Sequence, residues 1–482
     1  MVFNSLQFLW FFVAVYALYR ATPVLMPPPR AHRAQNWLLL VASYYFYAAW
    51  DYRFLALLAA STIVDYSCGL AMGSMTDQRK RRMVLWLSVG FNLTLLGFFK
   101  YFNFFADNLQ ALFAALGMQV DDVTLRVLLP IGISFYTFVT MSYVIDVYRR
   151  EIAPTRNLVD FAVFVAYFPH LVAGPILRAT ALLPQIAQPR HVTSAQMREG
   201  AWLMAWGFFQ KIFVADNLAP LASHVFAADT HPSGVNVLLG TYAFAFQIYG
   251  DFAGYSNIAR GTSKWMGIEL IENFRFPYLV LTPQAFWRHW HISLSTWLRD
   301  YLYIPLGGSR GTAAQTQRNL LITMLLGGLW HGAAWTFVLW GLYQGLLLIL
   351  YRPFESAFAA LHSGRRFGGT SRFAAWLVMF HFTCFGWLIF RAPSMGKLGE
   401  MTRSLFTQFA PASVEVAGLL VPLLLYTLPL LAVHLWEART DDVLAVPRLR
   451  QIGVRYAVYA ATLYLILLFG NFGGSDFIYF QF

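Results

Sequence analysis

One histidine lies inside a long apolar stretch of the chain. His331 follows Trp330 and two glycines, Gly327 and Gly328, within residues 320–350. An ionisable side chain at membrane depth is costly to bury, so it is a candidate functional residue. Because burial disfavours the charged imidazole, we expect a neutral His331 that can accept a proton. The alternative is a structural histidine that bonds a neighbouring helix while small residues allow close packing.

A second group of reactive and aromatic side chains occupies residues 286–308. It holds three tryptophans, two histidines, two arginines and one aspartate, which is unusual for a lipid-facing span. At helical spacing Trp287, Trp290 and Trp297 share a face, and Pro305 with two glycines ends the element. We expect one wall of a site here, or an interfacial helix anchored by an aromatic belt.

Metal chemistry is not expected in either group. His289 and His291 are two residues apart, so a helix would point them to different faces, and no Cys, Glu or HExxH pattern completes a ligand set. Asp251 lies in the apolar residues 235–260. It is either a site residue or the partner of a basic side chain elsewhere in the chain.

The composition indicates what kind of element carries these residues. Of 482 residues 58% are hydrophobic and only 12% are charged, whereas a soluble domain carries about a quarter charged residues. The formal net charge of +12 comes from basic residues in short connectors, which favours contact with an anionic inner leaflet over nucleic-acid binding. Cys68 and Cys384 are far apart and predict neither a zinc site nor a disulfide. The chain reads as a polytopic all-α membrane protein with no soluble domain.

Apolar runs predict about eleven transmembrane helices with re-entrant or interfacial helices between them, in a single domain 1–482. Helices are expected at 3–19, 36–50, 54–72, 84–104, 127–147, 199–215, 235–260, 319–349, 373–391, 414–436 and 454–471, with a broken element at 158–178. Basic connectors such as residues 79–82 follow the odd spans, whereas Asp121 and Asp122 precede the fifth. This bias places the N-terminus outside and the basic connectors in the cytoplasm.

At both histidine groups the sequence resembles the membrane-bound O-acyltransferase family, in particular its bacterial branch of alginate O-acetyltransferases. The likeness also covers the opening residues 1–5, residues 167–176, residues 251–255 and the closing residues 477–482. It implies an O-acetyltransferase of the bacterial inner membrane with His331 and His291 as catalytic residues.

The resemblance also implies the substrates and partners. The donor would be acetyl-CoA in the cytoplasm, and the acceptor an exported polysaccharide or a periplasmic acetyltransferase partner, with no metal cofactor. Substrate contacts are expected from the following side chains: Trp287, Arg299, Asp300, Tyr303, Trp330 and Asp251. Arg299, Arg310 and Arg318 could hold donor phosphates, although inner-face topology explains such arginines equally well.

Two other functions remain open on the sequence. A transporter of sugar, lipid or protons could use His331 and Asp251 as relay groups. Alternatively, the chain could be a scaffold that anchors the proteins of polysaccharide synthesis and catalyses nothing itself. Within the acetyltransferase hypothesis, peptidoglycan is an alternative acceptor to an exopolysaccharide.

Overall fold

The computed structural model describes residues 1–118, 128–172, 174–354, 369–409, 414–474 and 477–478. These residues form helices joined by turns, with no strand among them, which confirms the all-α prediction. Asp121, Asp122 and residues 479–482 lie outside the described residues. The chain packs as two compact units, of which one comprises Met1–Ala201 and Ile258–Ile271, and the other Trp202–Asn257 and Glu272–Phe482.

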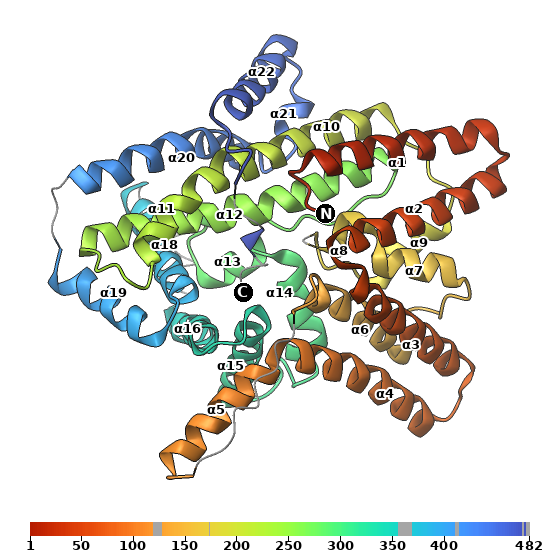
Figure 1. The fold of residues 1–482 in the computed structure, drawn as a ribbon, viewed down its shortest axis with the longest axis horizontal. Helices are drawn as coiled ribbons and strands as arrows, with labels where there is room; N and C mark the ends of the chain where they lie inside the picture. The colour runs from red at the N-terminus through yellow and green to blue at the C-terminus, as the bar shows by residue number, and fades with distance from the viewer. Residues whose placement is uncertain (119–127, 173, 355–368, 410–413, 475–476, 479–482) are drawn as a thin grey trace. The chain divides into compact units, whose positions relative to one another are not determined.

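The first unit is built from the N-terminal helices (Figure 1). They are α1 (Leu6–Leu25), α2 (Pro28–Asp51), α3 (Leu55–Ser74), α4 (Gln78–Leu96), α5 (Phe102–Ala115), α6 (Ile133–Arg149), α7 (Leu158–Ala166), α8 (Phe168–Leu171) and α9 (Ala179–Ala187). Two further helices, α10 (Ser194–Phe208) and α12 (Gly234–Trp265), contribute to both units. The break between α7 and α8 confirms the interrupted element predicted at 158–178.

Local sequence signals explain how several of these helices begin and pack. The Ser5 hydroxyl accepts the backbone N–H of Phe8 at 3.1 Å and caps α1. Inside the unit Asp65 of α3 is fully buried and accepts both bonds from the Asn92 amide of α4, at 3.0 and 2.9 Å. Such a paired polar group joins apolar helices where the hydrophobic effect alone does not choose their register.

The second unit holds the two histidine groups. Its helices are α11 (Asp216–Phe226), α13 (Pro283–His289), α14 (Ile292–Leu298), α15 (Ala313–His331), α16 (Trp335–Tyr351), α18 (Gly369–Arg391), α19 (Met395–Thr407), α20 (Val414–Thr440), α21 (Ala445–Arg448) and α22 (Ile452–Phe469). Two π-helical turns, η3 (Phe209–Ala215) and η5 (Arg299–Tyr303), interrupt the α-helical path. Such turns are rare and are often found at functional sites.

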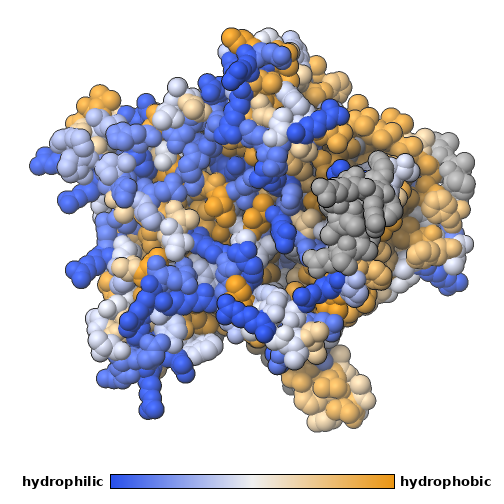
Figure 2. Space-filling view, turned by 180° about the vertical axis from the view of Figure 1, so that it is seen from behind, coloured by the Kyte–Doolittle hydropathy of each residue, from blue (hydrophilic) through white to orange (hydrophobic). Residues whose placement is uncertain are grey.

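Seven helices in the described part of the chain are long and apolar enough to cross a membrane. They are Leu6–Leu25, Pro28–Ser74, Gln78–Ala115, Trp335–Phe354, Thr370–Arg391, Glu415–Thr440 and Ile452–Phe469. In Figure 2 the end of α5 is seen as an orange projection, where Phe105, Leu109 and Leu112 are exposed. The chain is a multi-pass membrane protein, and the span count of about eleven stays a prediction.

The structure corrects the prediction of one helix over 319–349. The helix ends at His331, and Gly332 is extended with φ −163° and ψ 153° before α16 begins at Trp335. A Cβ at Gly332 would meet the ring of Phe337, so the glycine allows the backbone to pass close to that ring. His331 therefore lies at a helix end rather than in the middle of a helix.

The structure also corrects the single helix expected from Trp287 to Trp297. The chain breaks at His291, whose φ of +43° and ψ of 54° are left-handed, between α13 and α14. The tryptophans on either side, Trp290 and Trp297, are buried at 2% and 5% exposure. These two rings line the protein interior, as a site wall would, instead of forming one interfacial face.

Candidate active site

The His291 and His331 rings both lie close to the indole ring of Trp330. The Trp330 ring lies 6.1 Å from the His291 ring and 5.1 Å from the His331 ring, between centroids. All three side chains are buried, with exposed fractions of 4% for Trp330 and His331 and 0% for His291. The structure thus brings together three of the residues that the sequence singled out, from two segments about 40 residues apart.

His331 sits in an aromatic enclosure at the end of α15. The rings of Trp340 and Phe390 approach it at 5.1 and 5.3 Å and nearly perpendicular to it. Because His331 is the last residue of α15, the carbonyl end of that helix adds partial negative charge. This charge favours the imidazolium that forms when the ring accepts a proton, a contribution of about 0.3–2 kcal/mol.

Glycines set the distance between the helix that carries His331 and its neighbour α16. A Cβ on Gly341 would meet the Met324 carbonyl of α15, and one on Gly328 would meet the Phe337 carbonyl of α16. Small residues at such an interface let two backbones approach closely. The small residues around His331 therefore serve helix packing, as one of the sequence-based alternatives proposed.

The His291 ring is held through its Nδ1 atom by Asn273. The Asn273 Oδ1 atom accepts the backbone N–H of Ser293 at 3.2 Å, which fixes that atom as the oxygen of the amide. The same oxygen lies 3.2 Å from His291 Nδ1. Since an amide oxygen cannot donate, Nδ1 carries the proton and donates to it.

This tautomer leaves the other ring nitrogen of His291 as an acceptor. His291 Nε2 is buried and has no hydrogen-bond partner among the described residues. Burial lowers the pKa of His291 to about 3, so the ring is neutral near pH 7. A buried acceptor without a partner is costly, and a hydroxyl group from a substrate would satisfy it.

An aromatic wall holds the His291 ring from the side. Phe252 of α12 meets it edge-on at 4.5 Å, and Phe274 stacks at 6.2 Å. Sequence reasoning missed Asn273, Phe252 and Trp340, because apolar and amide residues in such stretches carry no motif that distinguishes a site from a core.

The other predicted site residues fall into two groups. Trp287 reaches the enclosure through Trp340, whose ring lies at 5.8 Å, and its indole N–H has no partner among the described residues. Arg299 instead pairs with Asp300 at 2.6 Å on η5, and the Tyr303 hydroxyl lies 2.7 Å from the Ser309 hydroxyl. Arg299 and Tyr303 are therefore not part of the ring cluster in the described structure.

Asp251 is the partner of a basic side chain, which was the second of its two sequence-based alternatives. Its Oδ1 atom lies 2.8 Å from Lys211 Nζ, and its Oδ2 atom accepts the Ile478 backbone N–H at 2.6 Å. Lys211 was not predicted. A lysine inside the apolar run 199–215 is the signal that could have revealed it.

His289 takes no part in a metal site in the described structure. Its Nδ1 atom bonds the Arg275 carbonyl. Within the described ranges, no three His, Cys, Asp or Glu side chains gather as ligands for a metal ion.

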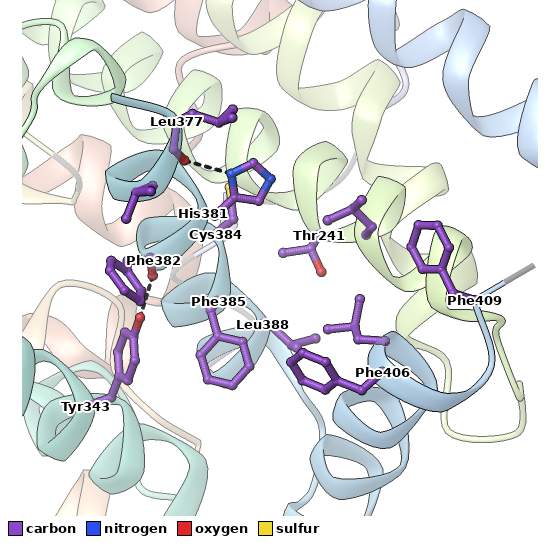
Figure 3. A pocket seen from close by; sticks show the side chains of 13 residues that line it. Thr241, Tyr343, Leu377, His381, Phe382, Cys384, Phe385, Leu388, Phe406 and Phe409 are labelled. Carbon is purple, nitrogen blue, oxygen red and sulfur yellow. Dashed lines mark hydrogen bonds between the residues drawn. The ribbon is translucent and has the colours of Figure 1, made fainter. Parts of the chain in front are cut away.

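An apolar cavity of about 710 Å³ lies beside α18 (Figure 3). One of its lining residues, His381, donates from Nδ1 to the Leu377 carbonyl at 2.7 Å and accepts the Tyr242 hydroxyl on Nε2, also at 2.7 Å. Both ring nitrogens are therefore occupied. This histidine has a structural role, and it offers a control for tests of His331.

Comparison with known proteins agrees with this geometry. Residues 147–389, which include both site histidines, match the membrane-bound O-acyltransferase family. The chain is 45% identical to the probable alginate O-acetylase of Azotobacter vinelandii over 84% of its own length and 78% of that protein. It is 35% identical to the peptidoglycan O-acetyltransferase of Helicobacter pylori, over 74% and 71%.

A more distant relative acts on a third kind of acceptor. The teichoic acid D-alanyltransferase of Bacillus subtilis is 29% identical over 54% of this chain and 68% of that protein. By their names the relatives act on alginate, peptidoglycan and teichoic acid, and all of them transfer an acyl group. The chain belongs to the membrane-bound O-acyltransferase family and is an O-acyltransferase.

Proposed function

We propose that this chain transfers an acetyl group from cytoplasmic acetyl-CoA, through the membrane, to a hydroxyl of an exported polysaccharide or to a periplasmic acetyltransferase partner. The observation that carries the proposal is the pair of buried histidines joined by Trp330. The alginate O-acetylase relatives support acetyl as the group and a polysaccharide as the acceptor. The whole chain, 1–482, would act as one catalytic domain in the inner membrane, with its N-terminus in the periplasm.

His331 is the proposed general base. The acceptor oxygen attacks the thioester carbonyl carbon, a C–O bond forms, and the C–S bond breaks. The hydroxyl proton passes to His331 and then to the departing thiolate, so charge and atoms balance. A base in this position contributes typically 10²- to 10⁴-fold in rate, and the end of α15 helps to stabilise the charged ring.

His291 is proposed to orient the acceptor. With Nδ1 occupied by Asn273, its Nε2 atom can accept a hydrogen bond but cannot donate one. Sugars carry neighbouring hydroxyl groups, so one can bond to Nε2 while the next is activated by His331. Orientation of this kind lowers the barrier by fixing the attacking oxygen before reaction.

Substrate-binding roles for the remaining predicted residues are part of the proposal. Trp287 and Trp330 would contact the substrates beside the two histidines. Arg299, with Asp300 and Tyr303, would lie near the phosphates of the donor, for which a guanidinium is well suited. Asp251 would act indirectly, through its contacts with Lys211 and Ile478.

The test is acetyl transfer by the purified protein from radiolabelled acetyl-CoA to soluble alginate or to peptidoglycan fragments. We expect His331→Ala to lower kcat by about 10²- to 10⁴-fold. The matched control is His381→Ala, which removes a histidine of the same unit whose nitrogens are both bonded. The control should stay close to wild type in turnover.

The outcomes separate the alternatives. Equal activity in His331→Ala and His381→Ala would refute the proposed base. Movement of sugar or protons across the membrane without acetyl transfer would support a transporter. Neither transport nor acetyl transfer, to a polysaccharide or to a periplasmic partner, would support a scaffold. Preference for peptidoglycan fragments over alginate would replace the proposed acceptor and leave the mechanism in place.

A further inference from the structure

A lysine is buried between two carboxylates beside α12. Lys211 Nζ lies 2.8 Å from Asp216 Oδ1 and 2.8 Å from Asp251 Oδ1. The side chains of Lys211 and Asp216 are 1% exposed and that of Asp251 is 4% exposed. Gly250 and Gly254 of α12 permit this approach, because a Cβ on either would meet the backbone of residues 207–211. Burying charged groups costs free energy even when they are paired, so a buried group of three charges is a candidate for a functional role.

The same group holds the C-terminal segment, of which residues 470–474 and 477–478 are described. Asp251 Oδ2 accepts the Ile478 N–H at 2.6 Å. Two more bonds hold Asn471, whose backbone N–H donates to the Ile212 carbonyl at 3.0 Å and whose amide donates to the Asp216 carbonyl at 3.2 Å. The segment is thus attached to η3 and to the start of α11 as well as to α12.

The anchored segment reaches the wall of the proposed site. Phe477, next to Ile478, is fully buried and lies 4.4 Å from the Tyr255 ring and 5.8 Å from the Phe252 ring. Phe252 in turn meets His291 at 4.5 Å. A continuous line of contacts therefore runs from Lys211 to the His291 ring.

We propose that Lys211 and Asp251 are positioning residues, which anchor the C-terminal segment so that Phe477 and Phe252 hold His291 in place. The ammonium group fixes one carboxylate oxygen of Asp251 and thereby directs the other to the Ile478 N–H. The positional role in catalysis rests on the proposed function of His291, but the anchoring itself does not.

The two aspartates provide a matched pair of variants. In Asp251→Asn, the single amide oxygen serves either Lys211 or Ile478, and the NH2 group faces a donor on the other side. Either the bond to Ile478 or the support that Lys211 gives to it is then lost. In Asp216→Asn, the contacts of Asp251 with Lys211 and Ile478 both remain, so the segment stays in place.

The first measurement is hydrogen–deuterium exchange of the purified full chain, followed by mass spectrometry. Asp251→Asn should remove protection from the peptides that contain Ile478 and His291, whereas Asp216→Asn should not. Lys211→Met should resemble Asp251→Asn. Its control is Lys264→Met, because Lys264 is also buried between two carboxylates, Glu199 at 3.1 Å and Glu269 at 2.6 Å.

The second measurement is the rate of acetyl transfer from acetyl-CoA. A displacement of about 1 Å at a reacting group can lower turnover about 100-fold, which is the loss in kcat that we expect for Asp251→Asn with little change in KM for acetyl-CoA. Ile478→Pro removes the N–H donor and leaves all three charged groups intact, so it should show the same loss even if Asp251→Asn folds poorly.

Equal exchange and equal kcat in Asp251→Asn and Asp216→Asn would overturn the inference, as would wild-type turnover in Ile478→Pro. If the wild-type protein transfers no acetyl group from acetyl-CoA, the proposed function fails instead. The exchange measurement then still decides whether Lys211 and Asp251 anchor the segment and protect the peptide around His291.

Discussion

At the scale of residues, the two site histidines differ in their supporting contacts. His291 has a defined tautomer, because its Nδ1 donates to Asn273 and its Nε2 remains an acceptor. The His331 ring packs against the rings of Trp340 and Phe390. It also lies at the carbonyl end of α15, where a positive charge on the ring is favoured. These differences support the assignment of the proton-accepting role to His331 and the orienting role to His291.

Asn273 should matter through the tautomer that it selects. Asn273→Leu removes the acceptor for His291 Nδ1, so the ring can place its proton on Nε2, which then donates to the acceptor hydroxyl instead of accepting from it. We expect a loss in kcat of roughly 10²-fold from the misoriented acceptor, whereas Asn273→Asp keeps an acceptor and should retain more activity. Steady-state kinetics on folded variants check this, and equal losses in both variants would argue against tautomer selection.

His291 should also make the protein sensitive to acid. Its pKa is about 3 in the folded protein but about 6.5 when unfolded, so the unfolded state binds the proton first as the pH falls. The free energy of unfolding therefore declines below about pH 6.5, by up to about 1.4 kcal/mol per pH unit. Thermal unfolding in detergent from pH 7.5 to 5 should show a steeper decline for wild type than for His291→Gln. Parallel curves would contradict a neutral buried ring.

At the scale of elements, the two breaks in helical structure create the site. One separates α13 from α14 at His291, and the other ends α15 at His331. At each break the histidine lies at the end of a helix, and its side chain is buried in the protein interior. The close pairing of α15 with α16, through Gly328 and Gly341, then places Trp340 against His331.

Close helix packing should be sensitive to a single added methyl group. In Gly341→Ala the new Cβ meets the Met324 carbonyl, so α15 and α16 must separate. We expect a destabilisation of about 1–3 kcal/mol and a loss of activity from a displaced His331. Gly418→Ala is the control, since a Cβ there meets nothing within 4 Å. Similar melting temperatures for both variants would show that the packing tolerates the change.

The sequence predicted the helices better than their ends. Apolar runs located α2, α3, α18, α20 and α22, because a stretch of that length and composition is stable only as a helix in a membrane. The breaks at His291 and Gly332 were missed, because tertiary contacts with Asn273 and Phe337 decide the backbone there. His331 was singled out from its residue type in an apolar run and His291 from the family resemblance, and their catalytic roles stay predictions. The hydrogen bond between Asp251 and Ile478 joins residues more than 200 positions apart, and no periodic pattern in the sequence reaches over that distance.

At the scale of the whole molecule, the orientation in the membrane determines which side supplies each substrate. The basic connector at residues 79–82 should be cytoplasmic and the N-terminus periplasmic. Single cysteines at Asn4 and Lys80, in a background with Cys68→Ser and Cys384→Ser, can be tested with a membrane-impermeant maleimide on intact cells. On intact cells we expect the maleimide to label the cysteine at position 4 but not the one at position 80. After the membrane is permeabilised, both should be labelled. The reverse pattern would invert the proposed direction of transfer.

The most direct test of the account is transfer across a sealed membrane. Proteoliposomes with the protein in one orientation would hold labelled acetyl-CoA on the cytoplasmic side and soluble alginate on the other. We predict acetylated alginate with wild type and with His381→Ala, and about 10²- to 10⁴-fold less with His331→Ala. Undiminished transfer by His331→Ala would contradict the central claim that this imidazole accepts the proton between the two compartments.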